Sequence, residues 1–491
     1  MAGVRHSLIF SFAEKYSILL INIVATMVLA RLLTPAETGL YSVAAGIINI
    51  AQVLRDFGVG NYIIQESDLT RRRLSTALGV SVVLGFTIAA AFICAAGPVA
   101  AAFHEPRLKT VILIMSLNFI LVGFASIGTA RLHRDMNFHA ALRIGIVSTA
   151  AHATTSVIMA SQGYGAVGMA WASVVGIAVY LVGNYVCYAE DIFLLPRFGE
   201  WRRVLGFGML ASGGYVLQEI GQRTADVVVG RFLGFGAAGL FSRANGLITL
   251  FQQSLMSAIT PVALGALARI NREGAELRSP FIRFLGYTTV VAWPLLGMMA
   301  LLASPIIRVA FGSQWMASVE TAQILCLAAG IAVLGRVSIT LFTAAGAVRR
   351  LFIVQLIATP VLVGAISLGA SFSIEEAAVG TVVGSMIHAL YSLHQVNRAI
   401  ATTWHQIGGT LGRSVLVTAA TLIAPTLVIF HYGLDADHYW PQTVVAGFGG
   451  GIAWLACIFA MRHPFRDEIL MGVRHSWSAL RQTKALSGEK A

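Results

Sequence analysis

Residues 74–102 read LSTALGVSVVLGFTIAAAFICAAGPVAAA, and this run contains no charged side chain. A helix needs roughly 20 apolar residues to cross the hydrocarbon core of a bilayer, so the run is long enough to span a membrane. Runs of the same kind, separated by short polar breaks, extend along the chain to about residue 461. We therefore predict an all-α polytopic membrane protein.

The composition of the whole chain agrees with a bilayer as its main solvent. Its 491 residues are 57% hydrophobic and 11% charged, whereas a soluble domain carries roughly 25% charged residues. The longest gaps between apolar runs, near residues 189–203 and 263–280, are too short to fold as domains. We predict about fourteen transmembrane helices, over residues 8–33, 39–60, 74–102, 108–130, 140–161, 164–188, 204–233, 237–262, 281–303, 318–345, 350–371, 374–397, 411–431 and 440–461.

The N-terminal segment carries a basic residue, Arg5, ahead of an apolar run, as a secretory signal peptide does. The run extends to Leu33, which is longer than the apolar centre of a signal peptide, and further spans follow. We interpret it as the first transmembrane helix. Prolines lie near several span ends, Pro261 among them, and three lie inside spans, where kinks are expected: Pro294, Pro360 and Pro425.

The four cysteines lie inside apolar runs and have neither metal-ligand spacing nor the pattern of a disulfide framework. They are Cys94, Cys187, Cys326 and Cys457. We interpret them as small apolar packing residues. The sequence predicts no metal and no cofactor.

The distribution of basic residues predicts the orientation. If the N-terminus is cytoplasmic, the cytoplasmic segments carry 25 of the 34 Lys and Arg residues, and the opposite side carries five. Cytoplasmic loops of membrane proteins are enriched in Lys and Arg, so this bias predicts that both termini are cytoplasmic. It also accounts for the net charge of +12 without a nucleic-acid partner.

An internal repeat relates two parts of the chain at an offset of 200 residues. Residues 30–52 read ARLLTPAETGLYSVAAGIINIAQ, and residues 230–252 read GRFLGFGAAGLFSRANGLITLFQ. Nine positions are identical, among them the pairs Arg31/Arg231, Gly39/Gly239 and Gln52/Gln252. The two copies are offset by six spans, so both cross the membrane in the same direction. This predicts two halves related by an axis along the membrane normal, as in two-lobed transporters.

The repeat divides the chain into an N-lobe of spans 1–6 and a C-lobe of spans 7–12. The predicted boundaries are residues 1–190 and 204–398, followed by two extra spans in residues 411–461 and a cytoplasmic tail of residues 462–491. In the tail, four apolar residues lie at near-helical spacing, which favours an amphipathic helix on the inner membrane surface: Ile469, Val473, Trp477 and Leu480. A disordered basic tail is the alternative.

Signals of enzyme activity are poor. Asp435-Ala436-Asp437 imitates the metal-binding motif of glycosyltransferases, but it lies in a predicted outer loop, where nucleotide sugars are absent. His431 and His438 lie nearby without a spacing that fixes a metal site. No phosphate-binding loop and no nucleophile elbow are present. We therefore predict that the protein is not an enzyme.

The most informative residues are the charges within span 7. Glu219, Gln222, Arg223 and Asp226 follow the spacing i, i+3, i+4, i+7 and so share one helix face, with Gln218 beside them. Each charge at the bilayer centre costs roughly 2.5–3.5 kcal/mol on insertion scales. The stripe must therefore face a water-filled cavity or polar partners. Arg223 can pair with Glu219 or Asp226, so a self-neutralised stripe that joins helices is the alternative to a cavity.

Other arginines complete the set of candidate binding residues. Arg55 lies beside Asp56 near the inner end of span 2, and its side chain alternatively snorkels to the interface. The remaining candidates are Arg243 in span 8, Arg336 in span 10, and the repeat-related Arg31 and Arg231 at outer helix ends. The intramembrane charges leave a net positive sum, and arginine forks suit phosphate oxygens. The sequence therefore predicts an anionic substrate.

The segment ARLLTPAETGLYSVAAGIINIAQVLRDFGVGNYIIQESDLT, residues 30–70, resembles Wzx-type polysaccharide flippases of the multidrug/oligosaccharidyl-lipid/polysaccharide superfamily. The segments RLHRDMNF, residues 131–138, and DVVVGRFLGFGAAGLF, residues 226–241, are also similar to that branch. The resemblance covers spans 1–12. It implies two six-helix lobes around a central cavity that opens alternately to each side.

The resemblance also implies a substrate and a location. The substrate would be an undecaprenyl-diphosphate-linked oligosaccharide, moved across the bacterial inner membrane for exopolysaccharide, capsule or O-antigen assembly. Its partners would be membrane lipids and the polysaccharide polymerase and export machinery. A basic cavity suits the diphosphate, and an apolar protein body suits the lipid tail.

The same sequence features bear on two other functions. A cation-coupled drug extruder of the same superfamily would need an acidic site in the first lobe, where Glu14 lies only at the inner start of span 1. A membrane polysaccharide polymerase would need a large loop, and the longest outer loop spans about residues 304–317. Both features favour the flippase.

Overall fold

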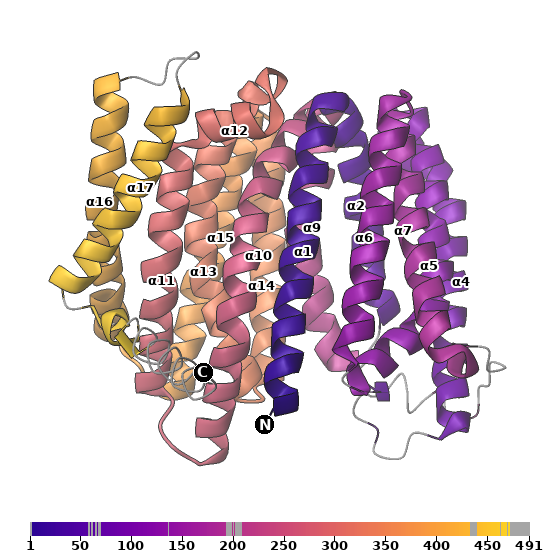
Figure 1. The fold of residues 1–491 in the computed structure, drawn as a ribbon, viewed down its shortest axis with the longest axis horizontal. Helices are drawn as coiled ribbons and strands as arrows, with labels where there is room; N and C mark the ends of the chain where they lie inside the picture. The colour runs from indigo at the N-terminus through magenta and orange to yellow at the C-terminus, as the bar shows by residue number, and fades with distance from the viewer. Residues whose placement is uncertain are drawn as a thin grey trace, which may run out of the picture. The chain divides into compact units, whose positions relative to one another are not determined.

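The fold is described here from a computed structural model. The structure describes residues 2–56, 59, 62–63, 66, 70–135, 137–192, 199, 201, 209–432, 439–461, 463–468 and 470–471. Within these residues the chain is helical and contains no strand (Figure 1). The elements are α1 (Ala2–Leu32), α2 (Pro35–Asp56), α4 (Arg71–Ala102), α5 (Pro106–Arg134), α6 (Phe138–Ser161), α7 (Gly165–Ile192), α9 (Met209–Leu233), α10 (Phe235–Arg272), α11 (Arg278–Leu301), α12 (Ala303–Phe311), the 3₁₀ helix η1 (Ser313–Ser318), α13 (Val319–Ala344), α14 (Val348–Ala370), α15 (Ile374–Ile400), α16 (Trp404–Tyr432) and α17 (Tyr439–Ala460).

Each predicted span coincides with one long helix. Ten helices in the described part of the chain are long and apolar enough to cross a membrane. The other four long helices are α1, whose described apolar stretch is Tyr16–Leu32, and the more polar α2, α9 and α15. The prediction of an all-helical membrane protein with about fourteen spans is confirmed.

One boundary differs markedly from its prediction. The eighth span was expected to end at residue 262, beside Pro261, but α10 continues to Arg272. Its last turns carry Arg269, which pairs with Glu273 four residues later. A helix that leaves the membrane becomes polar, so hydropathy does not mark its continuation.

The described chain divides into two compact units, each considered by itself. Unit 1 contains residues 1–250, 307–321 and 355–384, and unit 2 contains residues 251–306, 322–354 and 385–491. The assignment of spans 1–6 and 7–12 to two lobes stays a prediction. The predicted tail helix at Ile469–Leu480 lies almost wholly outside the described residues.

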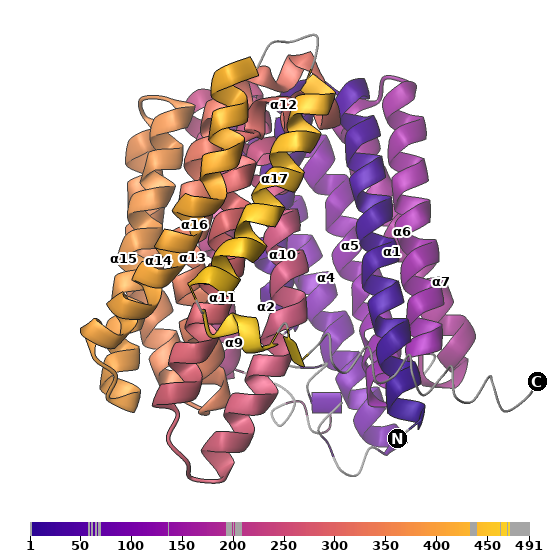
Figure 2. The same ribbon diagram turned by 60° about the vertical axis from the view of Figure 1, so that its left-hand side comes forward.

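The core of unit 1 forms where α2, α4, α5 and α7 meet. Leu40 and Ile48 of α2 are buried with Phe119 of α5, whose ring stacks on Phe92 of α4 at 5.4 Å. Helices α5, α6 and α7 run side by side, and α1 packs on α6 (Figures 1 and 2). Gly85 of α4 lies directly against the backbone of α5, as small residues permit in membrane bundles.

The turns that join successive helices of unit 1 lie alternately at its two ends. At one end, Glu37 at the start of α2 pairs with Arg107 at the start of α5, at 2.5 Å, and accepts a hydrogen bond from the backbone N of Ala166 in α7, at 2.7 Å. At the other end, Arg134 donates to the carbonyls of Ile63 and Glu66 at 2.6 Å. This alternation is that of an up-and-down bundle. The cytoplasmic location of the termini stays a prediction.

Unit 2 has its own core of aromatic and aliphatic side chains, including Phe281, Phe284 and Phe342. The last two helices attach to it through α11. Trp454 of α17 donates to the carbonyl of Val290 at 2.8 Å, and α16 packs against both α11 and α17.

Candidate functional site

The polar stripe of span 7 lies on α9, and its central ion pair is formed. Arg223 Nε donates to Glu219 Oε1 at 2.8 Å, as the i, i+4 spacing predicts. The Arg223 side chain is 40% exposed and that of Glu219 is 20% exposed. Arg223 lies ten residues before the end of α9 at Leu233, which is about 15 Å along the helix axis. An exposed charge at this depth requires water beside it.

The rest of the stripe differs in burial. Gln222 is exposed and Gln218 is partly buried, whereas Asp226 is 7% exposed. Asp226 Oδ1 has no hydrogen-bond partner among the described residues, so the alternative pair with Arg223 is not formed there. The carboxylate of Asp226 therefore lies about one helical turn from the Arg223 guanidinium, which is paired with Glu219.

Two helices pack on α9: α2 lies directly beside Arg223, and α14 lies on the side opposite the stripe. On one side Gly46 of α2 fits against Arg223, since a Cβ on Gly46 would lie 3.5 Å from the Arg223 carbonyl oxygen. On another side Thr359 of α14 donates to the carbonyl of Leu217 at 3.2 Å. At 100° per residue, Leu217 lies roughly half a turn from the centre of the stripe. The stripe therefore points away from α14.

Arg243 of α10 is enclosed by aromatic rings. Its guanidinium lies 4.7 Å from the ring centroid of Trp315 and 5.2 Å from that of Phe311, and it donates to Thr38 Oγ1 at 3.5 Å. Its Nε is buried without a hydrogen-bond partner in the described part of the chain. These contacts place Arg243 in a packed cluster within unit 1.

The repeat-related arginines have different surroundings. Arg31 is exposed and donates to the carbonyl of Val309 at 3.0 Å. Arg231 is exposed at the end of α9. Arg55 near the end of α2 is 7% exposed, and the side chain of Asp56 lies outside the description.

Arg336 belongs to unit 2. It donates to Gln252 Oε1 at 2.9 Å, and Gln252 Nε2 in turn donates to the carbonyl of Ala329 at 3.0 Å. Gln252 is buried, and sequence reasoning did not include it among the candidates. Its identity with Gln52 in the repeat was the signal that could have drawn attention to it.

The weaker enzyme and metal signals gain no support. No group of three His, Cys, Asp or Glu residues that could hold a metal occurs among the described residues. Asp435, Asp437 and His438 lie outside them, and His431 lies exposed near the end of α16. All four cysteines are free.

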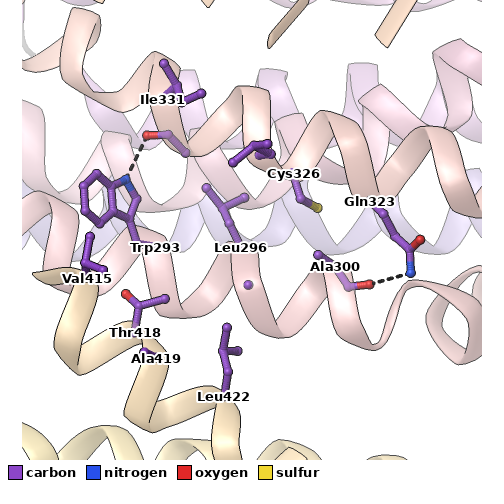
Figure 3. Close-up of a pocket in the computed structure, with 13 residues that line it drawn as sticks. Trp293, Leu296, Ala300, Gln323, Cys326, Ile331, Val415, Thr418, Ala419 and Leu422 are labelled. Atoms are coloured by element: carbon purple, nitrogen blue, oxygen red, sulfur yellow. Dashed lines mark hydrogen bonds between the residues drawn. The ribbon is translucent and has the colours of Figure 1, made fainter. Parts of the chain in front are cut away.

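Unit 2 also contains an apolar cavity of about 490 Å³ between α11, α13 and α16 (Figure 3). Three lining side chains carry N–H or O–H groups, and each donates to a backbone carbonyl: Trp293 to Gly330 at 2.9 Å, Gln323 to Ala300 at 3.2 Å and Thr418 to Ser414 at 2.8 Å. The lining therefore offers hydrocarbon and few free donors. Such a cavity does not suit a sugar or a diphosphate.

Comparison with known sequences gives a family match. The family described as "Polysaccharide biosynthesis protein" matches residues 28–320. The chain is 25% identical over 431 residues to the lipopolysaccharide biosynthesis protein WzxC of Escherichia coli, with 83% of each chain covered. It is 25% identical over 456 residues to the succinoglycan biosynthesis transport protein ExoT of Rhizobium meliloti, with 92% of this chain and 91% of ExoT covered.

Solved structures share the fold. The lipid II flippase MurJ in an inward closed conformation superposes with a TM-score of 0.76 at 14% identity, covering 94% of this chain and all of MurJ. An inward-facing multidrug resistance transporter of the MATE family superposes with a TM-score of 0.60 at 15% identity, covering 78% of this chain and 94% of the transporter. At these identities the likeness concerns the fold alone.

Proposed function

Since the chain belongs to the polysaccharide biosynthesis protein family, we propose that it is a flippase for lipid-linked oligosaccharides. The substrate is an undecaprenyl-diphosphate-linked repeat unit, and transport proceeds by alternating access across the bacterial inner membrane. The translocated repeat unit is then used in the assembly of an exopolysaccharide, a capsule or an O-antigen. In this proposal the protein transports its substrate and catalyses no bond cleavage.

The observation that carries the proposal is the exposure of Arg223 and Gln222 in the α9 stripe. Lipid would exclude the 40% exposed Arg223 side chain, so water or substrate must lie beside it. A guanidinium forms two parallel hydrogen bonds to phosphate oxygens, which suits the diphosphate. Gln222 on the same face supplies amide donors and an acceptor that suit sugar hydroxyls.

The stripe supplies the principal substrate contacts in this proposal. Glu219 holds Arg223 in the empty protein, and Asp226 offers a second acidic partner, while Gln218 and Gln222 extend the polar surface. Arg55 and Arg231 are assigned secondary contacts with the substrate, whereas Arg336 is held by Gln252 within unit 2. The packed surroundings of Arg243 and the backbone contact of Arg31 favour a closing role for these two residues.

Partners and orientation follow from the same proposal. Membrane lipids surround the protein, and the lipid tail of the substrate lies among them. Both termini lie in the cytoplasm. A polysaccharide polymerase and export machinery receive the flipped repeat unit on the periplasmic side.

Deletion of the gene tests the proposal. We expect loss of a surface or secreted polysaccharide and accumulation of lipid-linked repeat units, measured by lipid extraction and mass spectrometry. Plasmid-borne wild-type protein should restore the polysaccharide. Normal polysaccharide together with altered drug resistance would instead support a drug extruder. The MATE-family multidrug resistance transporter has the same fold as this chain.

A further inference from the structure

The segment between α11 and α13 folds back onto the end of α1. Residues 307–321 belong to unit 1, although the helices on either side of them belong mainly to unit 2. Gly312 ends α12 with a φ of 102°, a conformation that glycine adopts readily. The reversal places Trp315 of η1, which is fully buried, against α1.

Side chains of this segment cap the end of α1. The last carbonyls of a helix lack partners within it. Trp315 Nε1 donates to the carbonyl of Ala30 at 2.7 Å, and Gln314 Nε2 donates to the carbonyls of Ala30 and Leu33, the latter at 3.3 Å. In the opposite direction, Arg31 donates to the carbonyl of Val309 at 3.0 Å.

Arg243 fastens the segment to two further helices. Its guanidinium covers the rings of Trp315 and Phe311, and it reaches Thr38 at the start of α2. A cation over an aromatic face is attracted by the ring, and a buried site strengthens the attraction. Residues 307–318 therefore join α1, α2 and α10 at the end of unit 1 that carries the α1–α2 turn.

We propose that residues 307–318 form a clasp that closes this end of unit 1 and must open during each transport cycle. The inference rests on the proposed function, because only alternating access requires this end to open. The basic-residue bias predicts that it faces the periplasm. None of residues 307–318 belongs to the buried core around Leu40, Ile48 and Phe119, so the clasp releases without unfolding that core.

Thiol labelling tests whether the clasp covers the start of α2. The experiment uses full-length protein without its native cysteines, reconstituted in nanodiscs. Labelling of Thr38→Cys measures access to the position that Arg243 covers, and labelling of Ala166→Cys measures access to a buried position at the same end. With a membrane-impermeant maleimide, Trp315→Ala should raise labelling of Thr38→Cys about tenfold. Trp315→Phe keeps the ring under the guanidinium, so it should raise labelling less.

The Ala166→Cys reporter guards against general unfolding. Its labelling should stay unchanged in both Trp315 variants. Unchanged labelling at Thr38→Cys, or an equal rise at both reporters, would overturn the clasp. This assay needs no substrate, so its result does not depend on the proposed function.

Cross-linking tests whether the clasp moves during transport. Leu33→Cys and Gln314→Cys, joined in cells by a short thiol cross-linker, should abolish polysaccharide export. A matched pair at the same end of unit 1, Glu37→Cys in α2 and Arg107→Cys in α5, should be cross-linked without loss of export. Normal export by the locked clasp would refute the proposal, whereas polysaccharide that persists after gene deletion would refute the proposed function alone.

Discussion

Gly39 and Gly239, which the internal repeat pairs at an offset of 200 residues, are in contact with each other in the structure. A Cβ on Gly39 would lie 2.7 Å from the Gly239 nitrogen, and a Cβ on Gly239 would lie 3.1 Å from the Gly39 nitrogen. Each would also collide with a carbonyl of the opposite helix, that of Phe235 or Pro35. The local symmetry axis of the repeat therefore passes between these two glycines.

Gly39→Ala should destabilise the protein because the added methyl group meets backbone atoms, which cannot rotate away. We expect a loss of roughly 1–3 kcal/mol, as for other overpacked sites. Gly236→Ala is the matched control, since nothing lies within 4 Å of its Cβ position. Thermal unfolding of detergent-solubilised protein measures both variants. Equal midpoints for Gly39→Ala and Gly236→Ala would contradict the close contact.

Arg223→Ala should reduce polysaccharide export while membrane expression stays near normal. We expect about a ten- to hundredfold loss, the factor that one charge-assisted hydrogen bond provides. Arg223→Lys should recover part of the export, because a point charge lacks the fork geometry. Export is measured as secreted or surface polysaccharide per unit of membrane protein.

The structural alternative for Arg223 predicts a different pattern. If the stripe only joins helices, loss of Arg223 should lower the amount of folded protein in the membrane. Combined neutral substitution of Arg223, Glu219 and Asp226 should then restore both protein and export. Normal export by this triple variant would exclude a substrate role for Arg223.

Gln252→Ala should destabilise the protein by roughly 1.5–3 kcal/mol, because Arg336 loses the acceptor of a charged hydrogen bond. The paired variant Gln252→Met with Arg336→Met should be less destabilised than the sum of its single variants, since no buried charge remains. Thermal unfolding of the four proteins gives the coupling. Additive effects would show that the 2.9 Å contact contributes nothing of its own.

A reporter fused after Asp437 should be active only as a periplasmic fusion, because the residue lies in the loop between the last two spans and the basic-residue bias places that loop outside. Alkaline phosphatase and green fluorescent protein fusions give opposite signals on the two sides. A fluorescent, phosphatase-negative fusion would invert the predicted topology.

Hydropathy and helical spacing were sufficient to predict the spans and the Arg223–Glu219 pair, because both depend on residues close in the sequence. The contacts of Arg243 and Arg336 could not be predicted in this way. Their partners Trp315 and Gln252 lie 72 and 84 residues away, and no local period connects them. The clasp segment was expected as a plain outer loop, because its short helix leaves no span-length hydropathy signal.

The hydrogen bond from Trp315 to Ala30 also sets an order of events during synthesis. The two residues are 285 positions apart, so at about 5–20 residues per second the ribosome needs roughly 15–60 s to deliver the indole after Ala30 has been made. During that interval the exposed carbonyls at the end of α1 depend on water for their hydrogen bonds. A nascent chain stalled before residue 315 should therefore have an unfinished first hairpin, even though all of that hairpin has already been synthesised.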